Sequence, residues 1–347
     1  MKEYLNVFIC DPNIVLKKPL SGQDFYLRRV IMLMREFGFN VTVLRPIHAK
    51  DFIKKKLADR NLIFHMHYVN LSDVVSLRVL SPEATLLLYV YQLDDPTWSY
   101  YEKFRYHTFL RLTSFSKLID RYVVPSYHLS KELYRIINSD KIKVLEPYFP
   151  CNKNLRNLFI NNKIKYLESK QLNILYVGRI NKYRFDVATT IKVLKHLADE
   201  GFHITFRLIS MKEMGLVVQH KILESGKLKI ELIGKRLTES EKAEIYGQSH
   251  ILFFACRGYS AMRPPLSIIE AISYGTVPLI SPVIAEFASI GDIVVENLNY
   301  ESLEYKIKHI VSNFKSINDK IFIPFSRFYS KDRFYKQLIS ILDNEYR

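Results

Sequence analysis

Short apolar runs alternate with amphipathic helical segments twice along this chain of 347 residues, and that repeated alternation restricts the fold more than any other feature. The first series contains five apolar runs typical of buried strands, which begin at Asn6, Phe39, Leu62, Leu86 and Tyr122. A helix with one apolar face is predicted between the first two runs, from the spacing of Leu27, Val30, Ile31 and Met34. Such alternation predicts a parallel sheet covered by helices.

A second series begins in the middle of the chain and predicts the same architecture again. Its buried-strand runs are Leu172–Val177, His203–Ile209 and Ile251–Ala255. Thr238, followed three residues later by Glu241, has the spacing of a capping box that opens a helix before the third run. The length of the chain also fits two domains, each large enough for its own core.

Residues 146–150, with the sequence E-P-Y-F-P, interrupt the alternation, and a polar stretch continues to about Lys170. Because X-Pro steps favour extended chain, we interpret this stretch as a linker. The expected organisation is α/β, with two Rossmann-like domains that face a cleft, at residues 1–150 and 171–325. A helix at 326–347 is expected to return to the first domain. In sheets of this kind, ligands bind at the carboxyl ends of the strands.

The segment after the third run of the second series has the most informative chemistry. From Met262 to Gly275 it reads M-R-P-P-L-S-I-I-E-A-I-S-Y-G. The two prolines pre-set a first helical turn near Leu266, whose free N–H groups favour an anion. Arg263, Leu266 and Ser267 are therefore candidate substrate-binding residues. Glu270, one turn inside, is either a ligand-binding carboxylate at the edge of an apolar face or the solvated charge of an ordinary amphipathic helix.

A basic turn follows the first run of the second series. Gly178 ends the strand, and Arg179, Lys182 and Arg184 come within the next six residues. A planar guanidinium group can hold two phosphate oxygens at once, so this turn is a candidate diphosphate clamp. An ordinary charged surface loop is the other interpretation.

Together these two segments resemble the C-terminal half of the retaining GT-B glycosyltransferases, the large group 1 or family 4 type that includes sucrose, mannosyl and lipopolysaccharide transferases. The resemblance depends on Gly178-Arg179 with a basic residue five positions on, and on Glu270-Ala271 with the turn at 275–278. The chain departs from the family at Met262, where the family has the first of its two glutamates, near the donor sugar. This departure bears on sugar choice and on activity.

The resemblance implies a metal-independent transfer with retention of configuration, from a UDP-, GDP- or ADP-sugar, with no cofactor and no metal site. It assigns Arg179 and Arg184 to stabilising the leaving diphosphate, which is electrostatic catalysis. It assigns Glu270 to the ribose hydroxyls and Lys235 to the neighbourhood of the base.

The same resemblance supplies three further candidate substrate-binding residues. Gly178 belongs to the basic turn. Gly22, at a junction between loop and helix, matches a glycine that approaches the donor phosphate. Asp94 follows the strand that begins at Leu86, where relatives contact the donor sugar, and it is otherwise expected to cap the next segment.

The net charge of +16 is spread over both halves and is compatible with three kinds of partner. These are a nucleotide-sugar, an anionic membrane surface that carries a lipid-linked acceptor, and nucleic acid, although no nucleic-acid-binding motif is present. The segment Tyr100–Lys117 interleaves Tyr and Phe with Lys and Arg. It is typical either of an interfacial helix or of a core helix ahead of the Tyr122 strand.

The predicted function is therefore that of a retaining glycosyltransferase whose acceptor is lipid-linked, a glycan or a protein. The alternatives are a catalytically degenerate GT-B protein that binds a glycan, a nucleotide or a partner, and a glycosyltransferase that acts on nucleic acid. The three cysteines include no C-x-x-C pair, so neither a disulfide framework nor a zinc site is expected. Without a long apolar run, a cytoplasmic location is expected, with peripheral attachment to the inner face of the membrane as an option.

Overall fold

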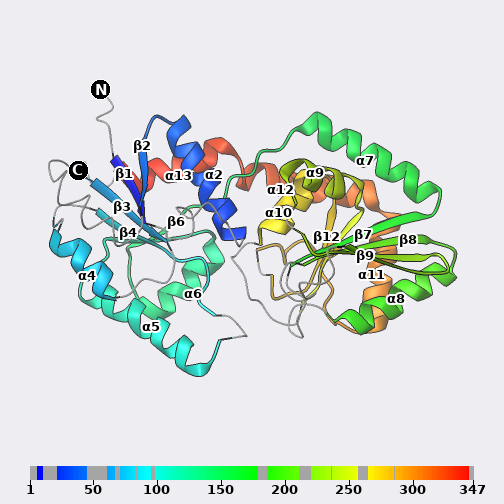
Figure 1. The fold of residues 1–347 in the computed structure, drawn as a ribbon, viewed down its shortest axis with the longest axis horizontal. Helices are drawn as coiled ribbons and strands as arrows, with labels where there is room; N and C mark the ends of the chain where they lie inside the picture. The colour runs from blue at the N-terminus through cyan, green and yellow to red at the C-terminus, as the bar shows by residue number, and fades with distance from the viewer. Residues whose placement is uncertain are drawn as a thin grey trace. The chain divides into compact units, whose positions relative to one another are not determined.

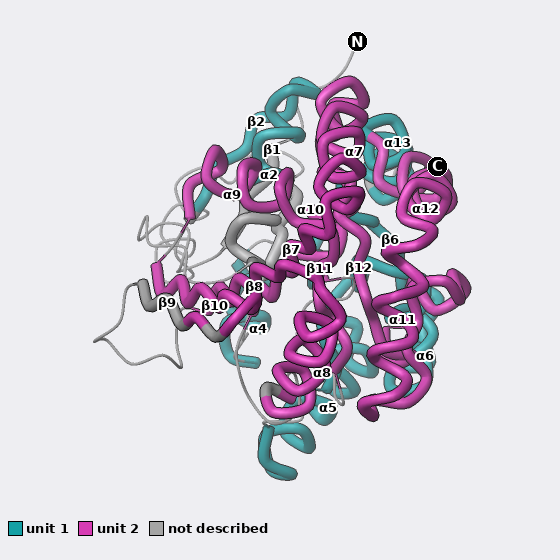
Figure 2. The backbone as a smooth tube through the Cα atoms, turned by 90° about the vertical axis from the view of Figure 1, so that its right-hand side faces the viewer, with its two compact units in different colours: residues 1–148, 261–263, 331–347 teal, residues 149–260, 264–330 magenta. Residues whose placement is uncertain are grey.

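The computed structural model describes residues 6–10, 22–44, 61–66, 71–80, 82, 85–94, 98–178, 186–210, 220–235, 237–256, 265–284 and 286–343. The described residues form two compact units. Unit 1 contains those from 6 to 148 and from 331 to 343, and unit 2 contains those from 149 to 330 (Figure 2). Four positions singled out from the sequence, Arg179, Arg184, Met262 and Arg263, lie outside the described residues.

Unit 1 is built on a six-stranded parallel sheet with the order β2-β1-β3-β4-β5-β6 (Figure 1). Its strands are β1 (Asn6–Cys10), β2 (Asn40–Leu44), β3 (Asn61–Met66), β4 (Thr85–Tyr89), β5 (Arg121–Val124) and β6 (Ile142–Val144). Its helices are α2 (Gly22–Glu36), α4 (Leu71–Leu80), α5 (Tyr100–Phe115), α6 (Tyr127–Ile137) and α13 (Lys331–Asp343). Helices α4, α5 and α6 lie on one face of the sheet, and α2 and α13 lie on the other.

The last helix, α13, is attached to unit 1 by polar contacts as well as by its apolar face. Glu146 is buried and accepts hydrogen bonds from Arg333 and Gln337, both of which belong to α13. At the start of the helix, Lys331 pairs with Glu36 at the end of α2 at 2.5 Å. These contacts explain why a segment so late in the chain belongs to the first unit.

Unit 2 repeats the architecture with the strand order β12-β11-β7-β8-β10-β9. Its strands are β7 (Gln171–Val177), β8 (His203–Ile209), β9 (His220–Ser225), β10 (Leu228–Ile233), β11 (Ile251–Phe254) and β12 (Val277–Ile280). All pair in parallel except β9, an antiparallel edge strand joined to β10 by a tight turn. The expected pair of α/β sheets is confirmed, and each is parallel apart from this edge strand.

Helices α7 (Lys153–Glu168), α9 (Glu239–Gln248) and α10 (Leu266–Ser273) cover one face of this sheet, and α8 (Val187–Asp199) and α11 (Tyr300–Ser312) cover the other (Figures 1 and 2). Helix α12 (Phe314–Phe328) packs against α10 and α7. The predicted capping box at Thr238 and Glu241 is present and opens α9. No helix among the described residues is both long and apolar enough to cross a membrane.

The linker predicted for residues 151–170 is wrong, because most of that stretch is helix α7. Asn152 caps the helix, and Arg156, Ile160 and Lys163 point into the core of unit 2. The prediction failed because two of these three inward positions hold cations rather than apolar side chains. The Nζ of Lys163 donates to the carbonyl of Tyr274 and to Oγ1 of Thr276, both at 2.9 Å. Burial holds the pKa of Lys163 well below its ordinary value.

Arg156 makes a second buried contact from α7. Its guanidinium donates to the carbonyl of Ile272 at 3.2 Å and to Asn318 of α12, and it lies over the ring of Phe322. The carbonyls of Ile272 and Tyr274 belong to the last turn of α10, where a helix presents unsatisfied acceptors and partial negative charge. Arg156 and Lys163 therefore fix the carboxyl end of α10.

Candidate functional site

The strand order of unit 2 defines where a ligand is expected. Strand β7 is central, and the chain leaves it toward β8 on one side and later returns to β11 on the other. The connections that follow β7 and β11 diverge at the carboxyl edge of the sheet, which makes this point a topological switch point. Gly178 follows β7 there, and α10 begins after the connection from β11.

Helix α10 presents an uncapped amino end at this edge. Pro265 occupies the N-cap position, and no side chain among the described residues caps the helix, whereas Ser, Asn, Asp or Thr side chains cap α5 to α9. Leu266 and Ser267 form the first turn and are partly exposed, while the following residues of the helix are buried. The predicted helix start at Leu266 is confirmed, and its first-turn N–H groups provide the positive end of the helix dipole.

Glu270 lies one turn inside α10 and is 8% exposed, so it is a buried carboxylate rather than a solvated one. One carboxylate oxygen accepts a hydrogen bond from the hydroxyl of Tyr246 at 3.2 Å, and the other lies 3.4 Å from Nζ of Lys242. Burial, and then the charge of Glu270, raise the pKa of Tyr246 well above its ordinary value. Glu270 is therefore held by donors from α9.

Lys235 follows β10 at the same edge of the sheet. Its ammonium group lies 2.7 Å from Glu241, the residue that completes the capping box of α9. Lys235 and the backbone and side chain of Thr238 lower the pKa of Glu241 to about 2. The structure thus places Lys235 at the carboxyl edge two strands from β7, with its charge directed toward α9.

Gly178 comes directly after β7 and has a φ of 145°, a conformation open to glycine but rarely adopted by other residues. Its N–H donates to the carbonyl of Ile209 at 3.0 Å, which continues the parallel ladder one residue past the strand. The basic residues Arg179 and Arg184, which follow in the sequence, lie outside the described residues.

Sequence reasoning did not identify Ser210, which directly follows β8. In the strand register Ile209 lies between Val177 and Ile233, so Ser210 sits at the carboxyl edge between the chain ends of β7 and β10. It is 3% exposed, and its hydroxyl has no hydrogen-bond partner in the described part of the chain. Leaving a buried hydroxyl unpaired costs about 1–3 kcal/mol, which a ligand with a polar group at this edge would recover. The available sequence signal was a serine placed immediately after a buried strand.

Two predicted site residues belong to unit 1. Gly22 is the first residue of α2. Asp94 follows β4 and pairs with Lys103 of α5 at 2.5 Å, and both side chains are about half exposed. The hydrogen-bonding partner of Asp94 is therefore a lysine on the next helix.

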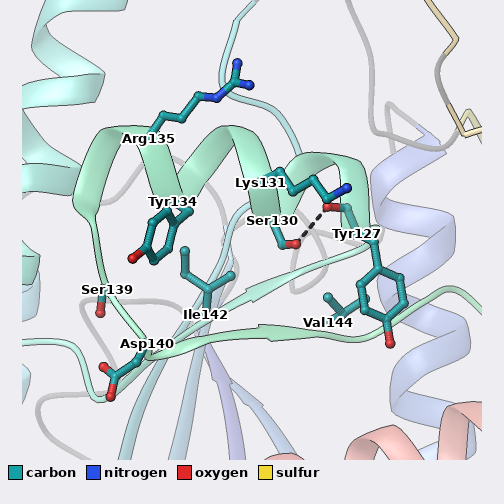
Figure 3. Close-up of a pocket in the computed structure, with 9 residues that line it drawn as sticks. All are labelled: Tyr127, Ser130, Lys131, Tyr134, Arg135, Ser139, Asp140, Ile142 and Val144. Carbon is teal, nitrogen blue, oxygen red and sulfur yellow. Dashed lines mark hydrogen bonds between the residues drawn. The ribbon is translucent and has the colours of Figure 1, made fainter.

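Unit 1 also has a shallow groove of about 550 Å³ between α6 and the edge strand β6. Figure 3 shows Tyr127 and Tyr134 extending from α6 toward the strand, which contributes Ile142 and Val144, while Arg135 points away from it. The groove holds no buried carboxylate or nucleophile, so its lining does not provide a reaction centre.

One group of potential metal ligands occurs among the described residues, at His196 of α8, Glu200 directly after that helix and Glu304 of α11. Lys308 already pairs with both carboxylates, at 2.6 and 2.7 Å. Its ammonium group neutralises the charge that would attract a cation, so this surface group is explained as an ion-pair network.

Solved structures identify the fold. The chain aligns over 98% of its length with HepE (Alr3699) of Anabaena in complex with UDP and glucose, with a TM-score of 0.67, 10% identity and 100% of that chain covered. A glycosyltransferase of Rickettsia africae aligns over 99% of both chains, with a TM-score of 0.65 and 13% identity. A UDP-forming α,α-trehalose-phosphate synthase of Burkholderia vietnamiensis aligns over 94% of this chain and 81% of its own, with a TM-score of 0.63 and 10% identity.

No protein-family model matches the sequence, and no curated protein matches it either. The alignments with solved structures identify the two α/β units as those of the GT-B glycosyltransferase fold. The fold is shared over nearly the whole chain, at about one identical residue in ten. The expected fold class is confirmed.

Proposed function

We propose that the chain is a glycosyltransferase that binds a nucleotide-sugar at the carboxyl edge of the unit 2 sheet. The observation that supports this most strongly is the switch point between β7 and β11. There the amino end of α10 and the hydroxyl of Ser210 lie at one edge, neither with a side-chain partner in the part of the chain that the structure describes. A helix amino end attracts phosphate, and a buried hydroxyl is stabilised by a polar ligand group. Because HepE was solved with UDP and glucose, a UDP-sugar is the first donor to test.

In the proposed complex the diphosphate lies against the first turn of α10, at Leu266 and Ser267, and against Gly178. Arg179, Arg184 and Arg263 surround it and neutralise the charge that develops as the glycosidic bond breaks. Transfer proceeds with retention and without a metal ion, and the leaving phosphate takes the proton from the acceptor hydroxyl.

The nucleoside is held by two groups at the same edge. Glu270, whose direction is fixed by Tyr246 and Lys242, accepts hydrogen bonds from the ribose hydroxyls. Lys235 lies beside the base, and its ion pair with Glu241 fixes its direction. Gly22 and Asp94 of unit 1 are the two further residues that the resemblance assigns to donor binding.

A second candidate function is a protein of the same fold that binds a nucleotide-sugar or a glycan without turnover. It is favoured by Met262, which stands where the resembling family has a glutamate near the donor sugar. The two functions share the binding site and differ in the chemical step.

The test begins with thermal unfolding in the presence of UDP, GDP, ADP and their glucose or mannose conjugates. A ligand at a hundredfold its dissociation constant adds about 2.7 kcal/mol of stability. We expect one nucleotide to stabilise the wild type and Arg327→Ala, an exposed arginine of α12, but not Arg179→Ala.

Release of free nucleoside diphosphate then separates the two functions. Release that accelerates with an acceptor supports the transferase, and binding without release supports the inactive alternative. The absence of stabilisation by every nucleotide would reject both.

A further inference from the structure

Helix α5 of unit 1 exposes aromatic side chains on its outward face. The exposed large apolar residues of this helix are Tyr100 (86%), Tyr101 (68%), Phe104 (58%), Leu112 (47%) and Phe115 (91%). At 3.6 residues per turn, Tyr100, Phe104 and Phe115 lie within about 60° of one another around the helix axis, with Tyr101 and Leu112 beside them. We call these five residues the aromatic face of α5.

The opposite side of α5 is already used for packing. Leu110 and Thr113 are fully buried, and the Thr113 hydroxyl lies 2.9 Å from the hydroxyl of Tyr122 on β5. Tyr106 and Phe109 pack against the same core. Because this side is fixed to the sheet, α5 cannot rotate to bury the aromatic face. Of the two alternatives predicted for Tyr100–Lys117, the core helix describes one side of α5, whose other side is exposed and aromatic.

Cations outnumber carboxylates around the aromatic face. On α5, Arg111 lies among the rings and Arg105 at the edge of this face, next to Leu112, and both are exposed. The neighbouring helix α6 carries exposed Lys131 and Arg135 and one acidic residue, the partly exposed Glu132. Glu102 is the only acidic residue of α5. It lies off this face and is held in the capping box of Ser99, which lowers its pKa through hydrogen bonds from the Ser99 backbone and side chain.

We propose that the aromatic face of α5 docks unit 1 on an anionic lipid surface. The helix lies in the interface plane, with its rings at the boundary between headgroups and acyl chains and its arginines at lipid phosphates. A second copy of the chain fits this face less well, because a symmetric contact brings Arg105 and Arg111 of both copies into one interface, where like charges repel. The docking does not depend on the proposed transferase activity, although it would bring the protein to lipid-linked acceptors.

The test is flotation of the purified full-length chain with two kinds of vesicle, pure phosphatidylcholine and an equimolar mixture of phosphatidylcholine and phosphatidylglycerol. We expect the wild type to float with the anionic vesicles only. The double variant Phe104→Ser/Phe115→Ser should bind them at least tenfold more weakly. The double variant Tyr305→Ser/Ile323→Ser removes side chains of similar exposure, 68% and 72%, from unit 2 and should bind like the wild type.

A charge variant separates lipid phosphates from a general apolar attraction. Arg105→Gln should lower the affinity for anionic vesicles about fivefold, the equivalent of about 1 kcal/mol, and added salt should weaken wild-type binding. Nucleotide-induced stabilisation, measured on the same variants, shows that they are folded. A variant that keeps this stabilisation but no longer floats has lost docking alone, whereas a protein that floats without it contradicts only the proposed function.

Three outcomes would overturn the docking proposal. They are no flotation of the wild type, equal flotation of the wild type and Phe104→Ser/Phe115→Ser, and a wild-type dimer in sedimentation that this variant dissociates. The last would assign the aromatic face to a second copy of the chain.

Discussion

The two units share one architecture but place their cations differently. In unit 2, Arg156 and Lys163 of α7 are buried and donate hydrogen bonds to the carboxyl end of α10. In unit 1, Arg105 and Arg111 lie outside, among the exposed rings of α5. The buried cations serve the internal geometry of unit 2, whereas the exposed ones are available to a partner. The comparison shows that the burial and the contacts of a basic side chain say more about its role than the net charge of the chain does.

Helix α10 illustrates what the internal arrangement achieves. Its carboxyl end is fixed by the buried basic side chains of Arg156 and Lys163, and no described side chain caps its amino end at the switch point. A helix held at one end presents its other end in a defined position, which reduces the ordering required when an anion binds.

The largest effect is expected for Lys163→Ala. The substitution empties the space of a fully buried side chain and leaves two acceptors, the Tyr274 carbonyl and Thr276, without their donor. We expect the free energy of unfolding to fall by about 4 kcal/mol, measured in urea. Lys165→Ala, at an exposed position of the same helix, should change it by less than about 0.5 kcal/mol. Equal effects of the two substitutions would show that Lys163 is not an internal support.

Two leucines of α5 test whether this helix of unit 1 has one packed side and one exposed side. Leu110 is fully buried and Leu112 is 47% exposed. We expect Leu110→Ala to lower the stability by about 3 kcal/mol and Leu112→Ala by less than about 0.5 kcal/mol. A large loss for Leu112→Ala in chemical denaturation would mean that the aromatic face is packed in solution.

A pH effect is expected from His250 in unit 2. Its Nδ1 accepts from the N–H of Asn173, its Nε2 contacts the carbonyl of Lys163, and burial lowers its pKa from 6.5 to about 4. The unfolded chain therefore binds a proton between pH 6.5 and 4 that the folded chain does not. The resulting stability is fully present above pH 6.5 and is lost as the pH falls toward 4.

At pH 5 this loss amounts to about 2 kcal/mol. We expect His250→Gln to be less sensitive than the wild type when unfolding at pH 7 and pH 5 is compared. His196→Gln, at a half-exposed position of α8, should keep the wild-type pH dependence. If His250→Gln loses as much stability as the wild type, His250 is not the titrating group.

The smallest change in stability is expected for two buried serines, each of which directly follows a strand of unit 2. Ser281 accepts from the N–H of Cys256 and donates to its carbonyl, whereas the Ser210 hydroxyl has no partner among the described residues. Ser281→Ala should therefore lower stability by about 1 kcal/mol. Ser210→Ala should leave stability unchanged or raise it slightly, and should weaken nucleotide binding about fivefold by titration calorimetry. Unchanged binding would remove Ser210 from the site.

The comparison of sequence with structure separates what periodicity can predict from what it cannot. Apolar runs predicted β7, β8 and β11, because parallel strands are buried on both faces and read as continuous apolar segments. The prolines before Leu266 located the start of α10. These features depend on local sequence, and local sequence was sufficient for them.

Features that depend on tertiary contacts were missed. Helix α7 was taken for a linker, because Arg156 and Lys163 occupy its buried face and their acceptors lie more than a hundred residues later. The β9–β10 hairpin was not predicted, although the alternation of Leu228, Ile230 and Leu232 after the turn at Gly226 is a readable signal for its second strand. Ser210 was missed because its importance arises from its place between β7 and β10, which only the strand order reveals.

The most direct test of the central claim, that unit 2 binds a nucleoside diphosphate at the carboxyl edge of its sheet, is amide hydrogen exchange with and without saturating UDP, GDP or ADP. We expect one nucleotide to slow exchange in peptides covering 174–178 and 265–270, where strand β7 ends and α10 begins. If none of the three protects either segment, or if protection appears only in unit 1, the claim is contradicted.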